Sequence, residues 1–123
     1  MVKITQEEFN KLVNSRVEET KHLLLVKARE YVRNNDPLHN FNATALRNNE
    51  CPAQSLHGML SKHLTSYFDM LNDIKDDVTI STAQIKEKFG DIIVYFMLQE
   101  ILFLANNENN RNSKNGLELL EIK

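Results

Sequence analysis

The chain has 123 residues, 41% hydrophobic and 26% charged, with a formal net charge of −2. This length suits one domain, and the balanced charge gives no overall reason to bind nucleic acid or an anionic membrane. No run of about 18 apolar residues stands out as a membrane span, and the N-terminal MVKITQEEF lacks an apolar signal core. We therefore expect a cytoplasmic protein. The few glycines and prolines predict an all-α fold, a bundle of three to four main helices in residues 1–105.

The first predicted helix begins after Thr5, because Thr5 and Glu8 have the spacing of a capping box, and it reaches Arg33. Its apolar residues recur at three- and four-residue steps, the period of a helix with one buried side. A stripe this long on a small protein often also serves a partner subunit, so we expect a homo-oligomer formed through the long helices. Lys27, near the helix end, either forms a solvated ion pair with Glu30 or belongs to a binding site.

A turn and a short helix follow. Asn34-Asn35-Asp36-Pro37 has the composition of a turn, since Asn and Asp tolerate unusual backbone angles and proline disfavours helix at the preceding residue. Asn40 and Phe41 then lie in a connecting segment, and loops with an aromatic anchor often shape binding sites. A helical turn or two is predicted over residues 42–47. The only cysteine, Cys51, cannot form an internal disulfide and is expected to be inert.

The next helix is predicted from residue 53 to about residue 75, after Pro52, which suits a first helical turn. Beside its apolar side runs a polar stripe at steps of four, three and four residues, made of Lys62, Ser66, Asp69 and Asp73. His63 adjoins this stripe.

The longest predicted helix covers residues 81–105, where Ser81 and Gln84 again have capping-box spacing. Glu87, Asp91 and Tyr95 are four residues apart, which places them in a polar stripe along one edge of its apolar face. Residues 106–116 are polar and of low complexity, typical of a flexible linker. Residues 117–123 supply aliphatic side chains that are either frayed or dock, and we favour docking on a neighbouring subunit.

If the two polar stripes face one another, four carboxylates could surround one point: Asp69, Asp73, Glu87 and Asp91. Hard oxygen ligands of this kind suit Mg²⁺, which in turn binds phosphate. Lysines and His63 could add phosphate contacts, and Tyr95 or Phe41 could face a base. The alternative is that both stripes are ordinary solvated helix edges.

Four segments resemble a family of small phage and prophage proteins described as MazG-like or nucleotide-modification-associated: KAREY (27–31), NNDPLHNF (34–41), GMLSKHLTSYFDM (58–70) and EKFGDIIVYFMLQEILF (87–103). The resemblance implies a helical bundle related to the all-α nucleoside triphosphate pyrophosphatases, usually oligomeric. Those enzymes hold Mg²⁺ with a Glu-x-x-Glu pair on one helix and a Glu-x-x-Asp pair on the next. Here Asp91 matches the final Asp, but Lys88 stands three residues before it, and the preceding helix has no Glu-x-x-Glu.

Three functions follow. The leading hypothesis is a phage-type protein of the host cytoplasm that binds, and so sequesters, a nucleotide or a nucleotide-derived defence signal. Its predicted ligand-binding residues are Lys27, Asn40, Phe41, Lys62, His63, Asp69, Lys88, Asp91 and Tyr95. The second is a Mg²⁺-dependent (deoxy)nucleoside triphosphate pyrophosphohydrolase, with Asp69, Asp73, Glu87 and Asp91 as metal ligands. The third is a structural interaction module.

Overall fold

The computed structural model describes the backbone of residues 1–122 and the side chains of residues 1–30 and 32–113. Within this part the chain forms four helices and no strand: α1 (Gln6–Tyr31), α2 (His39–Asn48), α3 (Pro52–Lys75) and α4 (Thr82–Ile122). The predicted all-α class is confirmed.

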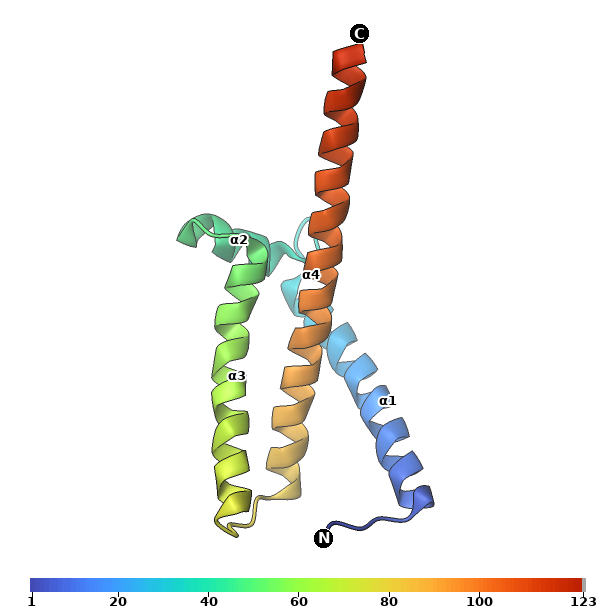
Figure 1. Cartoon of the computed structure of the whole chain (residues 1–123), viewed down its shortest axis with the longest axis vertical. Helices are drawn as coiled ribbons and strands as arrows, with labels where there is room; N and C mark the ends of the chain where they lie inside the picture. The colour runs from blue at the N-terminus through green and yellow to red at the C-terminus, as the bar shows by residue number, and fades with distance from the viewer. Residues whose placement is uncertain (123) are drawn as a thin grey trace.

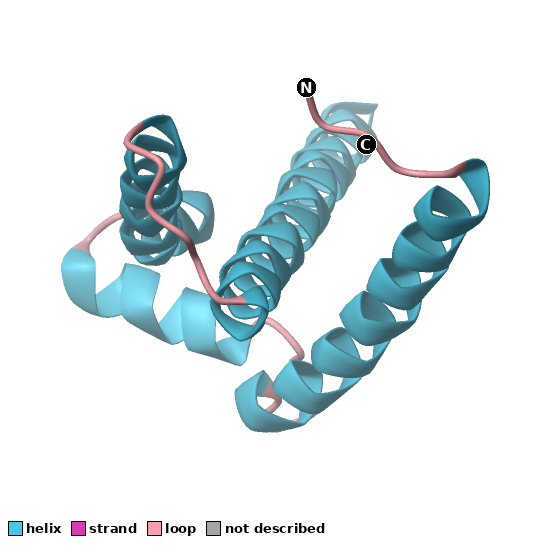
Figure 2. Ribbon diagram, turned by 90° about the horizontal axis from the view of Figure 1, so that it is seen from below, coloured by secondary structure: helices cyan, strands magenta, loops and turns pink. Residues whose placement is uncertain are grey.

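The helices are arranged around α4. The helices α3 and α4 run antiparallel and pack along each other, α2 packs across the start of α3, and α1 packs on α4 (Figure 1). Towards its N-terminus α1 leans away from α4, and seen from below it stands apart from the α3–α4 pair (Figure 2). The fold is therefore an antiparallel pair of helices, α3 and α4, with α2 packed on α3 and α1 packed on α4.

Local signals determine where the helices begin and turn. The Thr5 hydroxyl accepts a hydrogen bond from the Glu8 N–H at 3.1 Å, and the Ser81 hydroxyl accepts one from the Gln84 N–H at 3.1 Å. Both predicted N-terminal caps are thus present. Asn34 and Asn35 have φ values of 54° and 62°, left-handed conformations that asparagine tolerates better than most residues. The turn predicted before residue 38 is confirmed.

The core lies between α2, α3 and α4. Five buried residues form one cluster: Phe41, Leu56, Leu60, Tyr95 and Leu102. Phe41 is fully buried at 0% exposure, so α2 is anchored by an aromatic side chain that enters the α3–α4 interface.

The helix α4 is longer than the sequence predicts. It continues through residues 106–116, where the composition favours a flexible linker. Asparagine is only a modest helix former, but Glu108 and Arg111 form an ion pair three residues apart that supports the helical extension. Docking of residues 117–123 stays a prediction, because their side chains lie outside the described residues.

Among the described residues, α4 over Thr82–Ser113 is long and apolar enough to cross a membrane, judged by length and composition alone. Only 17% of its most apolar 18-residue stretch is buried inside the protein. Charged residues such as Lys88, Asp91 and Glu100 interrupt this segment, so it contains no continuous apolar run of about 18 residues. The low burial shows instead that much of the apolar surface of α4 is uncovered.

Candidate functional site

Four charged or aromatic side chains meet where α1, α3 and α4 come together. The Nδ1 atom of His63 lies 3.8 Å from Oδ2 of Asp91, and the ring centroids of His63 and Tyr95 are 5.0 Å apart. The Nζ atom of Lys27 lies 5.5 Å from the centroid of the Tyr95 ring. We call Lys27, His63, Asp91 and Tyr95 the His63 cluster.

Helix geometry explains why these residues meet. Asp91 and Tyr95 are four residues apart, which puts them on one face of α4. His63 is three residues after Leu60, a core residue, so it lies beside the surface of α3 that packs on α4. Tyr95 belongs to the core as well and is only 9% exposed. The cluster therefore lies directly at the edge of the packed interior.

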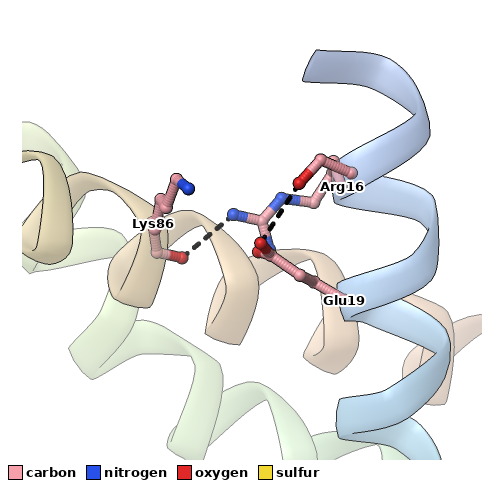
Figure 3. Close-up of polar contacts among 4 residues, drawn as sticks. Arg16, Glu19 and Lys86 are labelled. Atoms are coloured by element: carbon pink, nitrogen blue, oxygen red, sulfur yellow. Dashed lines mark hydrogen bonds and ion pairs between the residues drawn. The ribbon is translucent and has the colours of Figure 1, made fainter. Parts of the chain in front are cut away.

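A polar contact positions α1 next to the cluster. The Arg16 guanidinium donates a hydrogen bond from Nη2 to the Lys86 carbonyl oxygen at 3.1 Å, and its Nη1 lies 3.6 Å from a Glu19 carboxylate oxygen (Figure 3). Seven residues, about two turns, after Arg16, Leu23 packs close to Gly90 of α4. Lys27 follows one turn later, so the same face of α1 carries it to Tyr95.

The cluster remains accessible at its rim. The side chains of His63 and Asp91 are 23% and 24% exposed, so each retains surface for a ligand. Their 3.8 Å separation is longer than a hydrogen bond. A lysine, a histidine and a carboxylate thus surround the ring of Tyr95. Together these polar groups can bind an anionic group and a hydroxyl or amino group side by side.

The predicted polar stripe of α3 does not enter this cluster. Lys62 and Asp69 are exposed, and at about 100° per residue they lie about 160–180° around the helix from Leu60. They therefore point away from α4, and only His63 points towards it. The expectation that the whole stripe from Lys62 to Asp73 faces the edge formed by Glu87, Asp91 and Tyr95 is wrong.

The predicted metal ligands are dispersed for the same reason. Asp69 is exposed on the far side of α3, and Asp73 is half-buried on that helix. Glu87 lines a hollow beside α1, together with Glu18 and Glu19. Among the side chains that the structure describes, no three His, Cys, Asp or Glu residues come together as a metal-binding group. These carboxylates do not fit the expected Mg²⁺ cage, and magnesium binding stays a prediction.

Three further predicted ligand residues have different surroundings. Phe41 is fully buried in the core, so a ligand cannot stack on it without disrupting the fold. Asn40 is half-buried on α2, and its carbonyl oxygen accepts a hydrogen bond from the Thr44 hydroxyl at 2.8 Å. Lys88 is half-buried and lies three residues before Asp91, on the same side of α4.

Two hollows lie away from the His63 cluster. One, of about 320 Å³, lies between the start of α3 and the middle of α4 and is lined mainly by small, apolar and asparagine side chains. The other, of about 450 Å³, lies between α1 and the start of α4. Sequence reasoning missed its residues Arg16, Glu19 and His22, although their spacing of three residues marks one polar border of the α1 stripe.

No protein family, curated protein or solved structure that we compared with this chain matches it. The resemblance to MazG-like phage proteins therefore stays a prediction. The functional proposal rests on the geometry of the His63 cluster.

Proposed function

We propose that this protein binds a nucleotide at the His63 cluster. The observation that carries the proposal is the meeting of Lys27, His63 and Asp91 around Tyr95, from three different helices. The His63–Asp91 contact and the position of Lys27 over the Tyr95 ring offset the free-energy cost of partly burying these charges, and the exposed rim of the cluster leaves the polar atoms of His63 and Asp91 within reach of a ligand.

Each side chain has a role that its chemistry allows. The Lys27 ammonium group carries only donors, and the His63 ring has at least one N–H in any state, so both can donate hydrogen bonds to phosphate oxygens. The Asp91 carboxylate can accept hydrogen bonds from a ribose hydroxyl or a base amino group. Together they match the two ends of a nucleotide, an anionic phosphate and a hydrogen-bonding nucleoside.

Tyr95 supports the other side chains and does not offer a stacking surface. Lys27 and the His63 ring both lie against it, and its exposed fraction is only 9%. A base would therefore pack at the rim of the cluster, while the Tyr95 ring keeps Lys27 and His63 in position. This role differs from the base contact that the sequence predicts for Tyr95.

Binding without hydrolysis is the function that this geometry favours. A pyrophosphohydrolase of the expected kind uses clustered carboxylates to hold Mg²⁺ at the phosphates. The four carboxylates predicted for that task are dispersed over α3 and α4, as described above.

Isothermal titration calorimetry with a panel of nucleoside mono-, di- and triphosphates and cyclic nucleotides tests the proposal. We expect at least one nucleotide to bind the unmodified chain. Lys27→Ala and His63→Ala should each weaken that binding about 10- to 100-fold, because a hydrogen bond to a charged group contributes about 1.5–3 kcal/mol.

The matched control is Lys62→Ala. Lys62 is adjacent to His63 in the sequence, but its side chain is exposed and points away from α4. This substitution should change affinity less than twofold. No binding across the panel at millimolar nucleotide, or an equal loss in Lys62→Ala and Lys27→Ala, would overturn the proposal. Release of pyrophosphate from triphosphates with Mg²⁺ would replace it with the hydrolase.

A further inference from the structure

We propose that two copies of this chain pair through the outer face of α4. The two α4 helices run antiparallel around a two-fold axis at Ile93, so that Lys86 of each copy lies opposite Glu100 of the other. The outer face of α4 is the surface made by Ile85, Lys86, Phe89, Ile93, Phe96, Met97, Glu100, Phe103 and Leu104. The inference is independent of the proposed nucleotide binding.

This face lies opposite to the packed side of α4. Leu98 packs against the core, and Phe89 is nine residues before it, which is about 180° around the helix at about 100° per residue. Phe96 and Phe103 follow Phe89 at seven-residue steps, close to two helical turns each. Most of the apolar stripe therefore turns away from α1 and α3, and its borders reach both helices. The Phe89 ring lies against Tyr67 of α3, with ring centroids 5.9 Å apart, and Lys86 lines the hollow beside α1.

Six of its apolar side chains are more than a third exposed, and Ile93 at its centre is half-buried. Phe96 is 52% exposed, Phe103 is 60% exposed and Leu104 is 61% exposed, and Phe89 and Met97 are 38% and 42% exposed. With roughly 150–200 Å² for a fully exposed large apolar side chain, the apolar residues of the face leave on the order of 500 Å² in contact with water. That is a large share of the roughly 800 Å² that each partner contributes to a standard interface.

Charge complementarity selects the partner and its direction. Lys86, Ile93 and Glu100 are seven residues apart, so they form one line along the outer face, positive at one end and negative at the other. A two-fold axis at Ile93 places Lys86 of each copy opposite Glu100 of the other copy. A parallel pair would instead place like charges together, which is unfavourable in an apolar contact.

The same charges determine the register. With the axis at Ile93, Phe89 of each copy meets Met97 of the other, and both charges are paired. An axis at Phe96 would place Glu100 opposite the apolar Ile92 of the second copy. The apolar residues alone allow either register, whereas the two charges favour only the first, because an unpaired charge in an apolar interface is costly.

A lipid bilayer is the other medium that could cover an apolar helix of this length. A membrane-spanning helix needs about 20 consecutive, predominantly apolar residues. On the outer face Lys86 and Glu100 are 14 residues apart, which is about 21 Å along the axis and short of a bilayer core of about 30 Å. A second copy that pairs both charges therefore fits this face better.

Sedimentation velocity of the full chain tests the inference with charge reversals. We expect the unmodified chain to be dimeric at micromolar concentration. Lys86→Glu and Glu100→Lys should each raise the dimer dissociation constant at least about 10-fold, because each creates two like-charge contacts. The double variant Lys86→Glu/Glu100→Lys should dimerise again, and the two single variants should form a heterodimer when mixed.

The control is Lys62→Glu, the same charge change on the exposed side of α3, which should leave the dimer unchanged. A second readout uses Ile93→Cys in a Cys51→Ser background, which should form a disulfide-linked dimer on oxidation, whereas Lys86→Cys in that background should not. A monomeric unmodified chain, a dimer insensitive to Lys86→Glu, a double variant that fails to recover, or recovery in the membrane fraction with lipid vesicles would overturn the inference.

Discussion

Truncation of Phe41 to alanine separates a core role from a ligand-binding role. The Phe41 side chain is fully buried at 0% exposure and packs with Leu56, Leu60, Tyr95 and Leu102. Removing a buried phenylalanine costs about 3–5 kcal/mol, because the transfer free energy and the packing around the cavity are both lost. That is a large part of the roughly 5–15 kcal/mol that stabilises a typical domain.

Urea unfolding followed by circular dichroism measures this cost. The protein concentration is held constant, since assembly makes apparent stability concentration-dependent. In a thermal melt followed by the same circular dichroism signal, at about 4 °C per kcal/mol for a chain of this size, the melting temperature should fall by roughly 12–20 °C. The control is Leu46→Ala on the same helix, where the side chain is 86% exposed, and it should change stability by less than about 0.5 kcal/mol.

Two outcomes would refute this account of Phe41. A loss below about 1 kcal/mol would mean that α2 is not anchored by this ring. Unchanged stability with lost nucleotide affinity would mean that Phe41 contacts the ligand, as the sequence analysis predicts. Phe41→Leu gives a milder test, since it keeps the site apolar and should leave nucleotide affinity unchanged.

The remaining predictions concern backbone and turn positions, measured by the same unfolding assay. Gly58→Ala should stabilise the protein by about 0.5–1 kcal/mol, because an added Cβ meets nothing within 4 Å and alanine is the better helix former. Gly90→Ala should gain less or lose stability, since its Cβ would lie 3.0 Å from Nη1 of Arg16. Asp36→Ala should cost about 1–2 kcal/mol, because its carboxylate accepts hydrogen bonds from the Leu38 N–H at 2.9 Å and the Asn42 amide at 3.1 Å. A stabilised Asp36→Ala variant, or a destabilised Gly58→Ala variant, would contradict these assignments.

Local chemistry determined the elements of this protein. Thr5 and Ser81 cap helices through contacts three residues away, and Asn34 and Asn35 adopt left-handed angles, so these signals act within a few residues of chain. Such short-range effects can be recognised in a sequence without knowledge of the fold. The end of α4 is the exception, because a polar, asparagine-rich composition favours a linker and yet permits a helix.

The orientation of the α3 stripe was decided by tertiary packing. Lys62 and His63 are adjacent in sequence, and adjacent helical residues differ in direction by about 100°. Which of them meets α4 depends on how Leu56 and Leu60 pack into the core, and this long-range contact has no local signature. The structure directs His63 towards Asp91 and Tyr95 and leaves Lys62 and Asp69 in solvent.

Periodicity and capping signals were thus enough to establish that the chain is helical and where polar side chains gather along each helix. Packing between the helices selected which of those side chains share a site, and it brought Lys27 of α1 to them. A helix presents several candidate faces, and burial of its apolar residues against other helices selects among these faces.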